Sequence, residues 1–504
     1  MILTLPLAAT PMTERGELGE AKVMEEEMLI DLPWLAPIGA LVLAAVVGIV
    51  LAVVLPRGRQ GLVGVWVGVA HLACAGLAAW VWLDLGFRAT MDGIVLIDGL
   101  SLTLMGLLGV AGALGVALAR PVVTGTDREG EFYAVLAATT LSAAVLGAAA
   151  DISLLAIALG LSSLASFVMT GYLRRSSRGN EASLKYYIYG TVAGAVMVYG
   201  LSWWFGLTGS TALAEIGKTL PDAPTAAVVA STTMVVAGLG YKAALVPFHF
   251  WTPDAYDGAP LPVAAYLSVL PKLAGLVALA RVLPLALPGD AMGWSTAIAV
   301  IAAVTMTVGN FAALPQRNVV RLLAYSSIAQ SGYLLMGIAA LEGSPDGLPS
   351  LVYYAIAYAA TNLAAFAAVL AVQRERRSVD LDAFAGLGRT HPWWTTALIL
   401  SFLSLLGLPP LAGFVGKLEV FTAAIDADQA WLAVVAVINT VISLYYYLRV
   451  IAPTVLTPPP TPAPRVAGAG GPLAAALAVS TVLTVAIGIA AEPLLELADQ
   501  SKVF

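Results

Sequence analysis

The chain has 504 residues, of which 60% are hydrophobic and only 11% are charged, with a formal net charge of −6. This balance excludes a soluble globular domain, and the acidic net charge gives no reason to expect a nucleic-acid partner. Cys74 is the only cysteine, which excludes a disulfide framework, a cysteine-ligated cluster and a cysteine-based zinc site. The three histidines, His71, His249 and His391, lie far apart in sequence, so we expect no metal site.

Apolar runs of about twenty residues, the length with which an α-helix crosses a bilayer, recur from one end of the chain to the other. We therefore predict an all-α polytopic membrane protein with about fourteen transmembrane helices. In chain order the predicted spans are 33–54, 61–85, 98–120, 131–149, 151–173, 182–208, 225–256 (interrupted), 260–285, 293–314, 318–341, 349–373, 392–424 (interrupted), 428–452 and 471–492.

Basic residues between the spans predict the orientation of the chain in the membrane. If the N-terminus lies outside, the connections from odd to even spans are cytoplasmic and hold fifteen arginines, against five basic residues on the other side. Cytoplasmic loops carry the excess of Lys and Arg, so both termini are predicted to be extracytoplasmic. The fifteen are Arg57, Arg59, Arg120, Arg128, Arg174, Arg175, Arg178, Arg317, Arg321, Arg374, Arg376, Arg377, Arg389, Arg449 and Arg465. The five are Arg15, Lys22, Arg88, Lys218 and Lys502.

Five basic residues remain inside the predicted spans: Lys185, Lys242, Lys272, Arg281 and Lys417. A lysine can lose its proton when it is desolvated, whereas an arginine effectively cannot, so a buried group that alternates between charged and neutral is expected to be lysine. Lys242, Lys272 and Lys417 lie deep, where a charge costs at least ~2.5–3.5 kcal/mol, and we interpret them as functional. Lys185 lies near the cytoplasmic end of its helix and is equally well explained by snorkelling to the interface. We interpret Arg281 as an anchor at the outer interface.

Two of the deep lysines lie beside prolines that are expected to break their helices. Lys242 precedes Pro247, and Lys417 follows Pro409 and Pro410 in SLLGLPPLAGFVGKLEVF. A broken helix at membrane depth is tolerated where it is buried in protein or lines a wet cavity. A pair of such breaks at corresponding places indicates an ion-handling inverted repeat, and ordinary proline kinking is the alternative.

The breaks fall in the seventh and twelfth spans, five spans apart, which predicts two inverted five-helix repeats. The predicted organisation begins with an extracytoplasmic extension at 1–30 and three transmembrane helices at 31–130. The two repeats follow at 131–285 and 286–452, and a proline-rich connection with the last helix occupies 453–504.

Further polar residues at membrane depth support a polar interior. Gln330 is a relay candidate because its side chain both donates and accepts hydrogen bonds, whereas the neighbouring serines and threonines are explained as well by helix packing. His249 and Asp254 follow the break at Pro247, toward the predicted cytoplasmic mouth. Asp257 is predicted to lie in the connection to the eighth span.

Two long motifs, GYKAALVPFHFWTPDAYDGAPLPVAAYLSVLPKLAG and GNFAALPQRNVVRLLAYSSIAQSGYLLMGI, resemble the antiporter-like membrane subunits of respiratory complex I, NADH-quinone oxidoreductase. The later segments GLPPLAGFVGKLEVF and NTVISLYYYLRVI are similar to the N subunit family in particular. The resemblance runs from about Asp98 to Ile451. The chain ends soon after the last span, without the lateral helix of the L subunit. It also has Lys417 where the M subunit is expected to carry glutamate.

The resemblance implies a proton relay in which Lys242 is the central ionisable group of the first half-channel. Lys272 would link the two halves, Lys417 would be the terminal group, and Lys185 matches the lysine of the family's sixth helix. Quinone reduction in neighbouring subunits would drive the relay. No cofactor is expected in this chain, and NADH, FMN, iron–sulfur clusters and quinone would belong to partner subunits. The M and K subunits would be adjacent, and the complex would lie in a bacterial inner membrane.

Two departures from the family pattern bear on this role. The family's fifth helix carries a Gly-Leu-Glu whose glutamate pairs with the central lysine, whereas this sequence reads LGLSSLAS, with Ser162 in the glutamate position. A serine cannot supply a counter-charge, so Lys242 is expected to lose its proton more easily or to rely on a partner from an adjacent subunit. Pro271 stands where the family usually has a small polar residue and is expected to kink the eighth span beside Lys272.

Three functions are compatible with these residues. The first is a proton-translocating subunit of a complex I-type enzyme. The second is a subunit of a multi-subunit cation/proton antiporter, which has the same fold without redox chemistry. The third is a structural complex I subunit that has lost its own pumping site, a function that Ser162 favours and the three deep lysines oppose.

Overall fold

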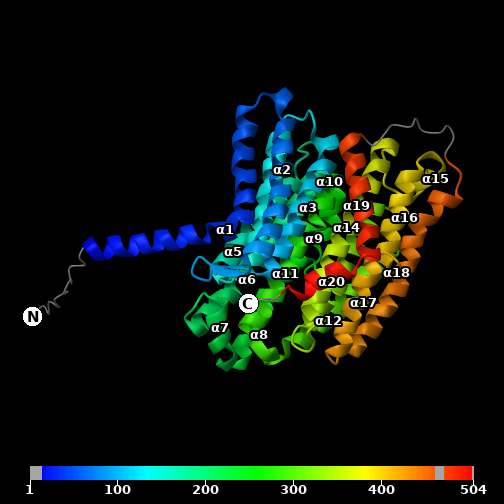
Figure 1. The fold of residues 1–504 in the computed structure, drawn as a ribbon. Coiled ribbons are helices and arrows are strands. Elements are labelled where there is room, and N and C mark those ends of the chain that lie inside the picture. The colour runs from blue at the N-terminus through cyan, green and yellow to red at the C-terminus, as the bar shows by residue number, and fades with distance from the viewer. Residues whose placement is uncertain (1–13, 460–469, 502–504) are drawn as a thin grey trace, which may run out of the picture.

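The computed structural model describes residues 14–459 and 470–501. Most of the long helices lie side by side in one bundle (Figure 1). The start of the predicted N-terminal extension and most of the predicted proline-rich connection lie outside the described residues.

The first three long helices form one flank of the bundle. They are α1 (Glu14–Val54), α2 (Gly61–Trp80) and α3 (Gly99–Val123), and a hairpin of β1 (Arg88–Thr90) and β2 (Val95–Ile97) precedes α3. Helix α1 contains Pro33 and Pro37, and its first part projects away from the bundle (Figure 1). A proline inside a helix removes a backbone hydrogen bond, which accounts for the bend.

The rest of the chain forms seventeen further helices in the described residues. They are α4 (Glu129–Ala148), α5 (Ile152–Thr170), α6 (Ser177–Thr208), α7 (Leu213–Thr219), α8 (Thr225–Ala243), α9 (Trp251–Gly258), α10 (Leu261–Leu267), α11 (Leu270–Ala286), α12 (Trp294–Ala313), α13 (Val319–Ala339), α14 (Gly347–Arg376), α15 (Leu387–Thr390), α16 (Pro392–Leu406), α17 (Ala412–Asp426), α18 (Ala430–Leu456), α19 (Gly471–Ile489) and α20 (Glu492–Asp499). Single 3-10 or π-helical turns occupy Arg57–Arg59, Val81–Leu85, Leu220–Asp222 and Leu381–Phe384, and Pro288–Gly293 is an irregular turn in which residues 289–292 have non-helical backbone angles.

Thirteen helical segments in the described part of the chain are long and apolar enough to cross a membrane. They match the predicted spans in order, except for the twelfth, which is divided between the shorter helices α16 and α17. The multi-pass, mainly helical fold is therefore confirmed. The β1–β2 hairpin is the only sheet among the described residues and departs from a purely α-helical prediction.

Both predicted helix interruptions are confirmed. Helix α8 ends before Ala244, whose φ of 60° is left-handed, and Pro247 lies in the irregular segment before α9. Helix α16 ends before Gly407, whose φ is 92°, and Pro409 and Pro410 lie between α16 and α17. Proline has no backbone N–H, and its ring clashes with the preceding helical turn. For this reason α8 and α9 do not form one continuous helix, and neither do α16 and α17.

A third interruption separates α10 from α11, where the sequence predicted a kink. Helix α10 ends at Leu267, and Pro271 occupies the first turn of α11, a position where its missing N–H costs no helical hydrogen bond. Lys272 is consequently placed at the start of a helix in the middle of the bundle rather than along a continuous span.

The centre of the bundle is formed by the α10–α11 span, α13 and α14. Within an 18-residue apolar stretch of each of these spans, 100%, 94% and 94% of the chain is buried. The corresponding share in α1, α6 and α19 is 33% each. The outer helices expose large apolar side chains such as Val53, Leu164, Val192 and Val441, which fits contact with lipid or with neighbouring subunits. Polar side chains that lie on the central helices are therefore shielded from bulk water.

One end of the bundle carries the α1–α2 turn, the α3–α4 turn and the start of α19, and we call it the arginine-rich side (top of Figure 1). Arg57 of the first turn pairs with Asp127 of the second at 3.2 Å. Arg374, at the end of α14, comes within 3.8 Å of the position that a Cβ on Gly470 would take.

Candidate functional site

Lys242 lies in the last turn of α8, immediately before the break, and its side chain is completely buried. Its Nζ donates a long hydrogen bond of 3.5 Å to the Oγ of Ser163 on α5. Helix α11 passes close by, since a Cβ on Gly275 would come within 3.1 Å of the Lys242 Cβ. None of the ion pairs between described residues includes Lys242, so its neighbours are hydroxyl and backbone groups rather than a carboxylate.

Two adjacent serines of α5 lie near this lysine. Ser162, the predicted counter-charge position, is buried, and its hydroxyl has no hydrogen-bond partner among the described residues. Ser163, which the sequence did not single out, provides the contact to Lys242. A Ser-Ser pair in an apolar helix gives no local signal for which hydroxyl faces the neighbouring helix, so only the packing of α5 against α8 identifies it.

Lys272 is fully buried in the first turn of α11 and is held by α13. Its Nζ donates to the backbone oxygen of Ser327 at 2.8 Å and contacts the Ser327 Oγ at 2.5 Å. The Ser327 Oγ also lies 2.7 Å from the hydroxyl of Tyr358 on α14, which donates to the Ser268 oxygen at 2.9 Å. Lys272 is thus joined through one serine to a hydrogen-bonded chain that crosses three central elements.

Gln330 lies one turn beyond Ser327 on α13 and connects four helices. Its Nε2 donates to the Leu405 oxygen of α16 at 3.0 Å and to the Tyr447 hydroxyl of α18 at 3.4 Å. Its Oε1 accepts a hydrogen bond from Tyr354 of α14. Gln330, the predicted relay candidate, thus lies among polar groups of three other helices. The tyrosines were missed because they read as ordinary core residues in an apolar helix.

Lys417 lies in α17 and packs against the end of the broken helix α16. Its side chain is buried, and its Nζ donates to the Leu406 oxygen at 2.9 Å and lies 4.4 Å from the centre of the Tyr333 ring. A cation is favoured at the C-terminal end of a helix, where carbonyl oxygens lack helical partners. Gly407 is required here, because its φ is positive and a Cβ would come within 2.9 Å of the Lys417 Cδ.

Lys185 belongs to a partly exposed charged cluster on the arginine-rich side. Its Nζ lies 2.8 Å from Glu181 and 3.1 Å from Asp254, and Arg321 reaches Asp254 at 3.2 Å and Asp257 at 3.7 Å. These residues line a cavity of about 240 Å³. Asp257 lies on the last turn of α9, not in the connection to the eighth span as predicted. Glu181 and Arg321 join the cluster without having been singled out from the sequence.

His249 lies in the break between α8 and α9 and is not brought to any of the lysines by a described contact. Its ring packs against Phe250 at 4.6 Å, and its Nδ1 has no hydrogen-bond partner among the described residues. The predicted supporting role of His249 in the proton relay therefore has no direct contact behind it among the described residues.

The interpretation of Arg281 as an interface anchor is wrong. Arg281 and Asp98, the N-cap residue of α3, are both completely buried and form a bidentate pair with two distances of 2.7 Å. The Arg281 Nε also donates to the Gly147 oxygen at 2.9 Å. The sequence missed this pair because the two residues lie 183 positions apart.

His391, between α15 and α16, makes a second buried contact with a carboxylate, on the arginine-rich side. Its Nε2 lies 2.8 Å from Glu375, and its ring stacks on Trp394 at 4.0 Å. Burial and the Arg376 charge outweigh the attraction of Glu375 and lower the pKa of His391 below its ordinary value of 6.5.

The lowered pKa of His391 predicts that stability falls as the pH drops below about 6.5. On acidification the unfolded chain takes up a proton at His391 at a higher pH than the folded chain does. The free energy of unfolding therefore decreases in acid. Thermal unfolding of the purified chain between about pH 5 and 8 measures this effect. His391→Gln should flatten this part of the profile, and an unchanged slope in the variant would contradict the assignment.

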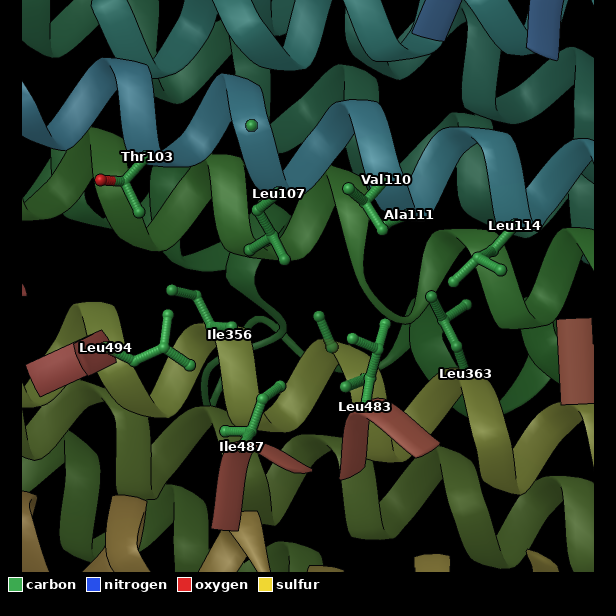
Figure 2. Close-up of a pocket in the computed structure, with 13 residues that line it drawn as sticks. Thr103, Leu107, Val110, Ala111, Leu114, Ile356, Leu363, Leu483, Ile487 and Leu494 are labelled. Atoms are coloured by element: carbon green, nitrogen blue, oxygen red, sulfur yellow. The ribbon is translucent and has the colours of Figure 1, made fainter. Parts of the chain in front are cut away.

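A separate apolar cavity of about 250 Å³ lies between α3, α14, α19 and α20 (Figure 2). Leu107, Ile356 and Leu483 point into it from three of these helices, and no ionisable side chain lines it. Among the described residues no three His, Cys, Asp or Glu side chains gather closely enough to hold a metal ion.

The central part of the chain, residues 149–443, matches the family described as NADH:quinone oxidoreductase/Mrp antiporter, TM. NADH-quinone oxidoreductase subunit N 1 of Streptomyces griseus is 39% identical over 419 residues, which cover 83% of this chain and 88% of that protein. Subunit N 2 of Roseiflexus castenholzii is 37% identical over 471 residues, covering 90% of this chain and 92% of the relative.

Two solved structures extend the comparison. A chain of respiratory complex I from Thermus thermophilus, solved with bound aureothin, is 31% identical with a TM-score of 0.78 and covers 92% of this chain and 99% of its own. A chain of the Mrp complex from Dietzia sp. has a TM-score of 0.84 at 24% identity, covering 93% of this chain and 97% of its own, and so shows likeness of fold alone.

Proposed function

Because the chain belongs to the subunit N family of NADH-quinone oxidoreductase, we propose that it is a proton-translocating membrane-arm subunit of such a complex. The observation that carries the proposal is the set of three fully or almost fully buried lysines, Lys242, Lys272 and Lys417, each beside a helix interruption. A buried amine is costly, and a chain that keeps three of them at membrane depth gains from their ability to exchange protons.

Between Lys272 and Lys417, polar groups supply much of a hydrogen-bonded path. Ser327 accepts from Lys272, and Gln330 lies one turn further along α13, surrounded by Tyr354 and Tyr447. A hydroxyl can accept a proton on one side and release one on the other, so a protonated amine can pass its proton on and return to the neutral form. Bound water is expected to fill the gaps between these groups, as it does between buried polar groups generally.

The helix interruptions favour this chemistry as well. The ammonium of Lys417 is stabilised by the free carbonyl end of α16, which supplies negative potential without a carboxylate. When a neighbouring charge changes, such a group can lose its proton because no full counter-charge holds it. We infer that quinone reduction in partner subunits supplies that change, and that NADH, FMN and iron–sulfur clusters belong to those partners.

The distribution of arginines between the two ends of the bundle supports a proposal for the orientation of the chain. We propose that the arginine-rich side faces the cytoplasm of a bacterial cell, with both termini on the opposite side. The charged cluster of Lys185, Asp254 and Arg321 then lies at the cytoplasmic mouth of the proton path. The repeats at 131–285 and 286–452 are proposed as the two half-channels, and the M and K subunits as the adjacent partners.

The missing counter-charge near Lys242 is the point on which the structural alternative rests. Ser163 is its hydrogen-bond partner, and we propose that a neighbouring subunit supplies a carboxylate from beyond α5 or that Lys242 works without one. Helix α5 exposes Leu161 and Leu164 on its outer face, which is compatible with such a neighbour.

Removal of the chain tests the proposal against a cation/proton antiporter. In inverted membrane vesicles lacking the chain, proton uptake driven by NADH should be lost, and it should return when the intact chain is supplied again. The opposite result, with NADH-driven proton uptake intact and sodium- or potassium-driven proton exchange lost, would contradict the proposal and favour the antiporter.

A further inference from the structure

An apolar groove runs along the outside of the bundle between α2 and α3, toward the arginine-rich side. Its volume is about 250 Å³, and its lining residues come from α2, α3, α4 and the first turn of α19. The α2 wall exposes Val65, Val69 and Leu72, which are 47%, 57% and 56% exposed. Because this surface belongs to membrane-spanning helices, the groove lies at the level of the bilayer hydrocarbon.

Glycines on α2 give the groove its depth. A Cβ on Gly64 would come within 2.7 Å of the Tyr133 ring, so this ring forms the floor at that point. A Cβ on Gly68 would meet only Val116, at 3.7 Å, which is an ordinary contact. The groove can therefore accept a slender apolar chain beside Gly68, and a larger side chain at that position would fill it without disturbing the helices.

Arg120 closes the groove at the arginine-rich end of α3. Its side chain is exposed, and none of the ion pairs between described residues includes it. The buried carboxylate of Glu129 approaches the same point: a Cβ on Gly61 would lie 3.4 Å from its Oε1 and 3.9 Å from the Arg120 guanidinium, while its Oε2 accepts a hydrogen bond from the Gly125 amide at 2.9 Å. The groove thus combines an apolar channel with a guanidinium at the level of the membrane surface.

We propose that this groove is a binding site for an anionic phospholipid of the leaflet on the arginine-rich side. An acyl chain would lie along Gly68 and Ala117, and the phosphate would meet the Arg120 guanidinium, which matches phosphate oxygens bidentately. Charge complementarity selects the occupant, since an apolar helix from a partner would leave this guanidinium unpaired. The site is distinct from the lysine path and does not depend on proton translocation.

Photolabelling with phospholipids tests the site. The full-length chain is placed in bilayer discs that contain either phosphatidylglycerol or phosphatidylcholine with a photoreactive group in the acyl chain, and labelled peptides are identified by mass spectrometry. We expect phosphatidylglycerol to label the lining parts of α2 and α3 about fivefold more than phosphatidylcholine does, the factor that ~1 kcal/mol per basic residue gives. Arg120→Gln should remove this preference, and Gly68→Leu should reduce labelling by both lipids.

Two matched variants serve as controls. Arg59→Gln removes an exposed arginine of the same side that does not line the groove, and Gly76→Leu adds the same side chain elsewhere on α2, where nothing lies within 4 Å. Both should label as the unmodified chain does. Equal labelling by the two lipids, or an unchanged preference in Arg120→Gln, would overturn the proposal. Loss of labelling in the assembled complex would overturn it too, because a protein partner would then occupy the groove.

Discussion

The variant Lys242→Met is expected to lower the number of protons translocated per electron while NADH oxidation changes far less. Methionine keeps the length and apolar stem of the buried side chain but cannot take up a proton. Without this amine a proton would cross as an unassisted charge at membrane depth, which costs ~2.5–3.5 kcal/mol. The lower value already slows proton passage through this chain by roughly 100-fold. Proton uptake and NADH oxidation, measured together in inverted vesicles, provide the ratio.

A control for this variant removes a lysine that lies outside the path. Lys218→Gln eliminates an exposed ammonium paired with Glu215 at 2.7 Å and should leave the ratio unchanged. If Lys242→Met also leaves the ratio unchanged in an assembled complex, the chain does not translocate protons through Lys242. The structural alternative, a subunit that bridges its neighbours, would then be favoured.

Replacing Asp98 by alanine is expected to destabilise the protein by about 3–5 kcal/mol, because Arg281 would be left as a buried charge without a partner. The bidentate contacts at 2.7 Å and the complete burial of both side chains exclude rescue by bulk water. The loss of the cap on Ser101 N–H, at 2.9 Å, adds about 1 kcal/mol. Thermal unfolding of the purified chain in detergent measures the change.

Two further variants distinguish the contribution of the Asp98–Arg281 ion pair to stability from that of the helix cap. Asp98→Asn combined with Arg281→Met removes both charges, keeps a capping side chain, and should recover most of the stability lost in Asp98→Ala. Glu215→Ala breaks an exposed ion pair and should cost about 0–1 kcal/mol. If Asp98→Ala were no more destabilising than Glu215→Ala, the pair would not be a stabilising element of the fold.

The membrane spans and helix breaks were predictable because their signals are local. An apolar run of sufficient length predicts a span wherever it occurs, and Pro247 and Pro409 disrupt their own helices whatever surrounds them. The burial of Lys242 and Lys272 was predictable for the same reason, since both lie near the middle of their predicted spans.

The partners of these residues were not predictable, because they come from distant parts of the chain. Arg281 was misinterpreted because Asp98 lies 183 residues earlier and looks like the start of an ordinary span. Tyr354 and Tyr447 were missed because a tyrosine in an apolar helix usually serves packing, and only the meeting of α13, α14 and α18 brings their hydroxyls to Gln330. Side-chain direction across helices is a property of tertiary packing.

The Asp98–Arg281 pair also bears on the order in which the protein is made. During synthesis α3 is made long before α11. Asp98 therefore has no final partner until a further 183 residues have been translated. The outer end of α3 can reach its native environment only after the eighth predicted span has been inserted. The contact that fixes the outer end of α3 therefore forms late, with a helix that the ribosome delivers long after α3.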